Sequence, residues 1–286
     1  MKLVHLTDPH LTTPPPMGSL LGRSHGGKRF LGYLSWSRKR RHSLRRIWLD
    51  GLQAELSRLA PDLIVVTGDL TQIGTVEEIE EARDWLDQLA PAERIAFVPG
   101  NHDSYAAESW SNLEAKWADY LPPGGAKDFP IIRQEGGVTL FGLSSAVPTA
   151  PLSAAGRLGV EQLNALEQGL EAHANSFRLL YLHHPPLPGM IQWRKRLTDA
   201  PALAELLERQ PVDLVLHGHR HRNQRSERLG AKVFCTAPAS AERASFRAFE
   251  IERDAEGWNV AMSRYERAED GFEIQESESW HARGRA

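Results

Sequence analysis

The chain has 286 residues, 41% of them hydrophobic, and a formal net charge of -3 at pH 7. This composition allows one sizeable buried core and argues against a protein that binds polyanions over its whole surface. The single cysteine, Cys235, excludes an intrachain disulfide and a thiolate metal cluster, and fits a reducing, cytoplasmic setting.

Short apolar runs rich in Val, Ile and Leu recur along the chain and predict buried strands. They are Leu3–Leu6, Leu63–Thr67, Ile95–Val98, Val138–Leu143, Leu179–Leu182 and Leu214–Leu216. Helical patterns separate several of them, at Ser43–Leu59, Val76–Leu89, Gly159–His173 and Ala202–Arg209. Strands alternating with helices predict an α/β fold built from layers.

The C-terminal part has a different pattern. Lys232–Thr236, Ser245–Ile251 and Trp258–Tyr265 predict strands with no helix between them, as in a meander or a second sheet. From about Arg267 onward the chain is polar, and we expect a frayed tail over residues 267–286. Residues 1–266 are then expected to form a single domain.

A basic segment follows the first strand. Nine Lys and Arg residues and no Asp or Glu lie between Pro9 and Leu49, so the rest of the chain carries an acidic excess. We expect residues 12–41 to form a long insert in which Leu, Phe, Tyr and Trp are interleaved with cations. Besides a plain solvated loop, its alternatives are a cap over a nearby site that meets an anionic or amphiphilic substrate, and a membrane contact.

Metal-binding side chains follow five of the predicted strands. The candidate ligands are Asp8, His10, Asp69, Asn101, one of the pair His183 and His184, His219, and His221. Open α/β sheets place ligands at these carboxyl ends. Residues two apart on an extended backbone face the same way, so we expect Asp8 with His10, and His219 with His221, to converge.

Carboxylate and imidazole donors without thiolate suit first-row divalent metals, with Mn, Fe, Zn, Co and Ni all acceptable. Seven donors are too many for one tetrahedral site and suit two sites that share a carboxylate. Paired metals about 3.5–4 Å apart serve in-line phosphoryl displacement. The other histidines are expected to have supporting roles: His5 packed in the core, and His217 in the core or behind the ligands.

Five short motifs follow one another along the chain: Asp8-x-His10, Gly68-Asp69, Gly100-Asn101-His102-Asp103, His183-His184-Pro185 and Gly218-His219-x-His221. In their order and rough spacing, these motifs resemble the calcineurin-like metallophosphoesterase superfamily. The cyclic-nucleotide and glycerophosphodiester phosphodiesterases are the most similar branch. The resemblance implies a four-layer α-β-β-α sandwich, with two mixed sheets flanked by helices. It also implies a dinuclear metal-dependent phosphoesterase in which a metal-activated hydroxide attacks phosphorus.

Residue roles follow from the same resemblance. Asp8, His10 and His221 would hold one metal, Asn101, His183 and His219 the other, and Asp69 would bridge them. His183 is preferred to His184 because the family has the ligand two positions before Pro. His102 would donate a hydrogen bond or proton to the developing charge, and Asp103 would orient His102. We expect His184, Trp193 and Arg29 to contact substrate.

The expected substrate is a small-molecule or lipid-linked phosphodiester or pyrophosphate, with a phosphomonoester as an alternative. A nuclease of the same superfamily is disfavoured by the acidic charge outside the insert. The chain has no signal-peptide pattern and no run of about 20 apolar residues, so we expect a cytoplasmic protein, with the insert as the candidate for peripheral contact at the inner membrane surface. The sequence leaves the oligomeric state open.

Overall fold

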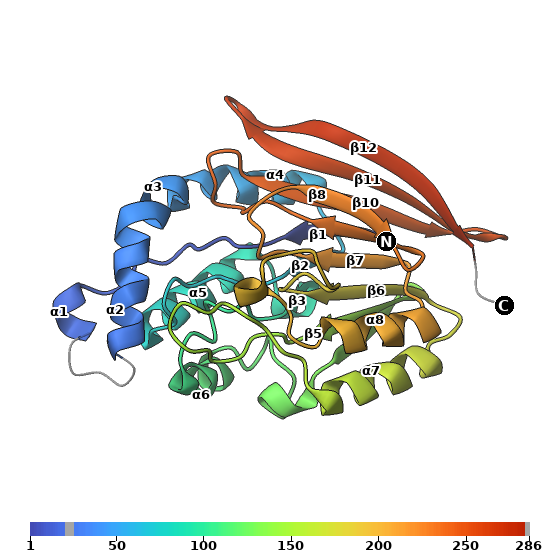
Figure 1. The fold of residues 1–286 in the computed structure, drawn as a ribbon. Helices are drawn as coiled ribbons and strands as arrows, with labels where there is room; N and C mark the ends of the chain where they lie inside the picture. The colour runs from blue at the N-terminus through green and yellow to red at the C-terminus, as the bar shows by residue number, and fades with distance from the viewer. Residues whose placement is uncertain (21–25, 284–286) are drawn as a thin grey trace.

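A computed structural model describes residues 1–20 and 26–283 of the chain. Two six-stranded sheets dominate it, and each contains both parallel and antiparallel pairs. The first sheet has the order β12-β11-β10-β1-β2-β3 and the second has the order β4-β5-β6-β7-β9-β8. Figure 1 shows the sheets stacked, with the long hairpin of β11 and β12 curving away at one end.

The strands of the first sheet are β1 (Lys2–Leu6), β2 (Leu63–Val66), β3 (Ile95–Phe97), β10 (Ser245–Arg253), β11 (Gly257–Ala268) and β12 (Gly271–Arg283). Those of the second are β4 (Ile131–Glu135), β5 (Val138–Leu143), β6 (Phe177–Leu182), β7 (Leu214–His217), β8 (Gln224–Arg228) and β9 (Ala231–Cys235). Each of the six central runs predicted from sequence forms a strand.

The α-helices are α1 (Met17–Leu20), α2 (Gly26–Ser35), α3 (Arg41–Ser43), α4 (Asp50–Leu59), α5 (Val76–Leu89), α6 (Ala107–Lys116), α7 (Val160–Ala172) and α8 (Ala200–Arg209). A π-helix spans Trp36–Arg40. Short 3₁₀ turns occupy Arg46–Trp48, Ala92–Arg94, Gly125–Asp128 and Trp193–Lys195. Among the described residues, no helix has the length and apolar character needed to cross a membrane.

The central strands are apolar on both faces because both faces are covered. In β6, Phe177 and Leu179 belong to the large core that lies between the sheets, whereas Leu180 and Leu182 face a second core. That second core is closed by α7 and α8, and helices α4 and α5 pack against the core of the first sheet. The predicted four-layer sandwich is therefore confirmed.

The prediction of a frayed tail after Arg267 is wrong. Residues 271–283 form β12, which pairs along its whole length with β11. The segment reads as polar because its outward positions carry Glu and Ser, but Phe272, Trp280 and Ala282 pack against the main core. These three apolar residues are the signal that the overall polarity of the segment concealed.

The insert is helical over much of its length, and not the loop that its length suggested. Helix α2 and the following π-helix cross one side of the molecule, with Arg29 and Gly32 on the buried face. A methyl group at Gly32 would lie 2.7 Å from Ile73 Cγ2 and would also overlap the Tyr105 hydroxyl. The close approach of α2 to the rest of the protein therefore requires glycine here. Arg23, one of the nine cations, lies outside the described residues.

Candidate metal centre

The predicted ligands lie on loops that leave the carboxyl ends of five parallel strands. Asp8 and His10 follow β1, Asp69 follows β2, and Asn101 follows β3. The second sheet supplies His183 after β6, and His219 and His221 after β7. The structure brings all of these side chains together beyond the carboxyl ends of strands from both sheets.

The first group consists of Asp8, His10, Asp69 and His221, which each offer one ligand atom within 4.8 Å of the others. His221 Nε2 lies 3.1 Å from Asp8 Oδ1 and 3.4 Å from His10 Nε2. His10 Nε2 lies 3.7 Å from Asp69 Oδ2. Nitrogen and oxygen lone pairs thus surround one small volume.

The second group consists of Asp69, His183 and His219, again within 4.8 Å of one another. His183 Nε2 lies 3.3 Å from Asp69 Oδ2 and 3.1 Å from His219 Nδ1. The predicted amide ligand joins this group, since Asn101 Oδ1 is 3.1 Å from the same nitrogen of His183. Asp69 Oδ2 belongs to both groups, and this is the position that a bridging carboxylate needs.

Neighbouring carbonyls fix how two of the rings are oriented. The Nδ1 atom of His10 lies 3.0 Å from the Thr71 carbonyl oxygen, and Nδ1 of His183 lies 2.7 Å from that of Thr67. A proton on each Nδ1 satisfies these carbonyls and turns Nε2 toward the centre. Burial opposes a charge on His183, but Asp69 and Asp8 raise its pKa to about 9, so a metal ion would replace the proton on its Nε2. Both histidines are thereby prepared to bind a cation.

Two buried atoms test whether the donor set fits metal ions. Asp8 Oδ2 accepts hydrogen bonds from Thr7 Oγ1 at 2.7 Å and from the backbone N–H of His219 at 3.0 Å. His219 Nε2 is buried without a hydrogen-bond partner among the described residues, and the buried Asp8 Oδ1 makes its 3.1 Å contact with another candidate ligand, His221 Nε2. Buried polar atoms in this state are costly unless something binds them. Together with the imidazole and carboxylate chemistry, they fit divalent ions.

The ligand loops are held in an unusual backbone conformation. Asp8, His10, Asp69, His219 and His221 all have positive φ, between 40° and 66°. The left-handed region costs a non-glycine residue about 1 kcal/mol or more, and such strain gathers at functional sites. The expected convergence of Asp8 and His10 is confirmed, whereas His219 and His221 belong to different ligand groups. The expected extended backbone is wrong, because all four residues have positive φ beyond the strand ends.

Neighbouring histidines keep the two candidate ligand carboxylates, Asp69 and Asp8, ionised. Burial would raise the pKa of Asp69, but His183, whose Nε2 lies 3.3 Å from Asp69 Oδ2, lowers it well below its usual range. Burial likewise opposes the ionisation of Asp8, and His221 brings its pKa down to about 2. Burial lowers the pKa of His10 to about 4, so this ring is neutral at physiological pH, the form that binds metal.

Asp103 does not orient His102, and that prediction is wrong. Its buried carboxylate accepts the backbone N–H groups of Asp69 and Gly100, both at 2.8 Å, and those of Leu70 and Thr71 at 2.9 and 3.0 Å. Asp103 thus fixes the backbone of the Asp69 loop. The Nδ1 atom of His102 instead lies 2.5 Å from the carbonyl oxygen of Gln72.

The three predicted substrate contacts are also revised. His184 is buried, with Nδ1 2.8 Å from Ser145 Oγ and Nε2 3.1 Å from the Ala154 carbonyl oxygen. Arg29 is buried and pairs with Glu108 at 2.5 Å. Trp193 is 67% exposed, and among the described residues the cleft wall is formed by its neighbours rather than by its ring.

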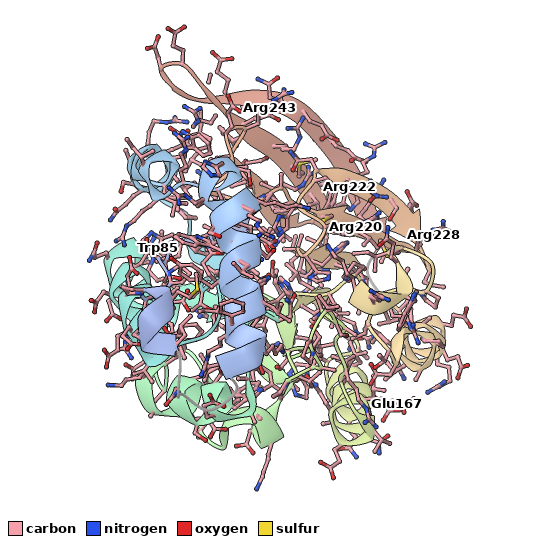
Figure 2. All side chains as sticks on the ribbon, turned by 60° about the vertical axis from the view of Figure 1, so that its left-hand side comes forward. Trp85, Glu167, Arg220, Arg222, Arg228 and Arg243 are labelled. Atoms are coloured by element: carbon pink, nitrogen blue, oxygen red, sulfur yellow. The ribbon has the colours of Figure 1, made fainter. Side chains whose placement is uncertain are left out.

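A cleft of about 420 Å³ opens over the ligands. Helix α2 and the π-helix form one wall with Lys28, Leu31 and Arg40, and Arg194 and Lys195 stand on another. Figure 2 shows α2 in the foreground and Arg220 to its right. In the sequence, Arg220 lies between the candidate ligands His219 and His221. The sequence singled out the insert but did not identify Lys28, Arg40 or Tyr105 as cleft residues.

Comparison with known proteins gives a consistent result. The profile of the calcineurin-like phosphoesterase family matches residues 1–223. A probable cyclic nucleotide phosphodiesterase of Synechococcus sp. is 33% identical over 210 residues, which cover 70% of this chain and 75% of that protein. A 3',5'-cyclic-nucleotide phosphodiesterase of Nostoc sp. is 30% identical over 233 residues, with 76% and 79% covered. The purple acid phosphatase PPD1 from yellow lupin shares the fold, with a TM-score of 0.63, 13% identity, and 98% of this chain and 53% of that chain covered.

Proposed function

Because this chain belongs to the calcineurin-like phosphoesterase family, we propose that it is a dinuclear metal-dependent phosphodiesterase that acts on a small anionic phosphodiester. The observation that carries the proposal is the position of Asp69 Oδ2, which is shared by the two ligand groups. Asp8, His10 and His221 would hold one ion, and Asn101, His183 and His219 the other. Two bound divalent ions would activate water and neutralise phosphate charge.

His102 is the group on this chain best placed to exchange a proton with substrate. It lines the cleft, and its Nδ1 proton is engaged by the Gln72 carbonyl, so Nε2 is the nitrogen available to substrate. Burial lowers the pKa of His102 well below its usual range, so the free ring is neutral and Nε2 accepts. A phosphate anion beside the ring raises that pKa and converts Nε2 into a donor toward the developing charge.

The walls of the cleft support an anionic substrate. Lys28 and Arg40 stand on the insert side, and Arg194 and Lys195 stand on the other side. The relatives named as cyclic nucleotide phosphodiesterases favour a small diester. A lipid-linked pyrophosphate is the second candidate, because the rim also carries exposed apolar groups, among them Leu152 at 78% and Leu31 at 43% exposure.

A substrate panel in the presence of manganese tests the proposal. It compares an aryl phosphodiester, a 3',5'-cyclic nucleotide, an aryl phosphomonoester and a lipid-linked pyrophosphate diester. We expect diester turnover that Asp69→Asn abolishes and that Asp84→Asn, an exposed carboxylate on α5, leaves unchanged. Turnover by Asp69→Asn at the wild-type rate would refute the dinuclear mechanism. If the lipid-linked pyrophosphate were turned over faster than the other substrates, the second candidate would be favoured.

We infer that the outer side of the insert meets an anionic membrane surface, which would place the protein at the inner face of the membrane. Arg38, Lys39, Arg41 and Arg45 are cations without a carboxylate partner among the described residues. Ile47 beside them is 69% exposed, and such a mixture of cations and apolar groups suits a lipid interface. Co-sedimentation with vesicles that contain phosphatidylglycerol, but not with phosphatidylcholine vesicles, is expected. Tighter, salt-sensitive binding to DNA or RNA would favour the nuclease alternative instead.

A further inference from the structure

Arg40 is the last residue of the π-helix Trp36–Arg40 in the insert. Its side chain lines the cleft together with Asp69, Asn101 and His102. π-Helical turns are rare and occur disproportionately at functional sites. The neighbouring cations Arg38, Lys39 and Arg41 are exposed, whereas Arg40 is half-buried.

The hydrogen bonds of Arg40 hold the side chain in place but leave its charge without a counterion. Nε donates to Gln72 Oε1 at 2.9 Å, and Nη2 makes long contacts of 3.4 and 3.5 Å with the carbonyls of Gly32 and Gln72. No carboxylate pairs with this guanidinium in the described parts of the chain. A partly desolvated cation that faces a cleft is a binding group for an anion.

Gln72 links Arg40 to the rest of the site. Its side-chain amide donates to the carbonyl oxygen of His10 at 2.8 Å, and its own carbonyl oxygen is the partner of His102 Nδ1. One residue therefore sets the position of a metal ligand, the candidate proton donor and Arg40. This arrangement gives a guanidinium from the insert a defined position relative to the ligands.

We propose that Arg40 contacts the phosphate group of the substrate and stabilises the charge that develops on it during hydrolysis. This inference rests on the proposed function and adds a catalytic residue supplied by the insert. A guanidinium offers two parallel N–H donors to two phosphate oxygens, and preorganised donors of this kind act most strongly in the transition state. The competing interpretation is that Arg40 only holds Gln72 in place and thereby supports the metal ligands.

Three variants separate these roles. Arg40→Gln removes the charge, Arg40→Lys keeps the charge but loses the paired donors, and Lys39→Gln is the matched control, because it makes the same charge change one position away at an exposed site. The measurements are kcat and KM for an aryl phosphodiester, inhibition by orthovanadate and by inorganic phosphate, bound manganese, and the thermal unfolding midpoint.

For Arg40→Gln we expect kcat/KM to fall about 100-fold, mainly in kcat, and orthovanadate inhibition to weaken at least about tenfold. Metal content and the unfolding midpoint should match those of Lys39→Gln, and Arg40→Lys should recover part of the activity. The inference is overturned if Arg40→Gln retains wild-type kcat/KM and vanadate inhibition, or if its loss of activity tracks a loss of manganese. A wild-type protein that hydrolyses no phosphodiester at all would refute the proposed function, and vanadate and phosphate binding would still decide the role of Arg40.

Discussion

The Nε2 atoms of His10 and His221 lie 3.4 Å apart, although 211 positions separate the two residues in the chain. The lone pairs of two such nitrogens repel each other unless a proton or a metal ion lies between them. The pKa of His10 is about 4, so its ring is neutral at pH 7 and carries no proton on Nε2. We therefore expect manganese to raise the unfolding midpoint. A free concentration 100 times the dissociation constant stabilises the fold by about 2.7 kcal/mol per site. Calorimetry with manganese and with chelator checks this, and coincident midpoints would contradict it.

The shared position of Asp69 Oδ2 predicts a difference in metal stoichiometry between two variants. Asp69→Asn removes a charge from both ligand groups, whereas His221→Asn alters the first group alone. We expect wild type to bind two manganese ions, His221→Asn to retain one and Asp69→Asn to bind fewer than one. Elemental analysis after desalting measures the ratio. Equal losses in the two variants would count against a bridging carboxylate.

Gly32 and Gly27 both lie on α2 but have different surroundings. A methyl group at Gly32 would overlap Ile73 and Tyr105, whereas one at Gly27 meets no atom within 4 Å. Gly32→Ala is expected to push α2 outward, which raises KM and leaves metal content unchanged. Gly27→Ala should leave KM unchanged and stabilise the helix by up to about 1 kcal/mol. Equal KM values for the two variants would show that the position of α2 does not shape the cleft.

Lys28 predicts how substrate binding depends on pH. Burial lowers its pKa to about 8, and its ammonium group donates to the Tyr105 carbonyl at 2.5 Å beside the cleft. Above pH 8 the folded protein loses this charge, so KM for an anionic diester should rise in wild type. In the unfolded chain Lys28 keeps its proton up to about pH 10.5. Because the folded protein releases this proton first, the free energy of unfolding is expected to rise as pH increases from 8 to 10.5.

The matched variant is Lys28→Met, which has no ammonium group at this position. The rise in KM that deprotonation of Lys28 causes in wild type should therefore be absent in the variant. Titrations of metal-bound groups affect both proteins equally, so the ratio of their KM values isolates Lys28. A ratio that stays constant from pH 7 to 9.5 would show that the Lys28 charge does not contribute to substrate binding.

Asp103→Asn should destabilise the fold. The carboxylate receives four backbone N–H groups, and an amide nitrogen in place of one oxygen faces two of those donors. Unsatisfied buried donors cost about 1–3 kcal/mol each. We expect the free energy of unfolding to fall by at least about 2 kcal/mol in urea titrations, against no change for exposed Asp84→Asn. An equally small effect in both variants would show that the Asp69 loop does not depend on this carboxylate.

Local residue pattern was enough to predict a layered α/β fold and the candidate metal ligands, whereas the four-layer sandwich was predicted through the family resemblance of the motifs. Continuous apolar runs such as Val138–Leu143 form strands that are buried on both faces, and the candidate ligands follow such strands where they end. The roles of Asp103, His184 and Arg29 could not be predicted, because they depend on partners distant in sequence: the Asp69 loop, Ser145 and Glu108. Their residue types fitted a functional role, and only the folded neighbourhood shows the hydrogen bonds that satisfy them.

The same limit applies to the two missed elements. Helix α2 has no acidic residue in its first turn, and the basic residues of the insert concealed its buried face. Strand β12 is recognisable mainly through its pairing with β11, which local composition does not reveal. In both cases tertiary packing, rather than local propensity, decides the structure.

The insert lies between β1 and β2 and supplies Lys28, Leu31 and Arg40 to the cleft, while the predicted ions would be held entirely by loops at strand ends. Apart from Arg40, the cleft-lining groups of the insert and the metal ligands thus occupy separate stretches of chain. Substitutions of Lys28 and Leu31 are expected to shift selectivity while the metal ligands stay in place, whereas Arg40 is expected to be retained. A graft of this segment from a relative is accordingly a direct way to redirect the enzyme to a new substrate.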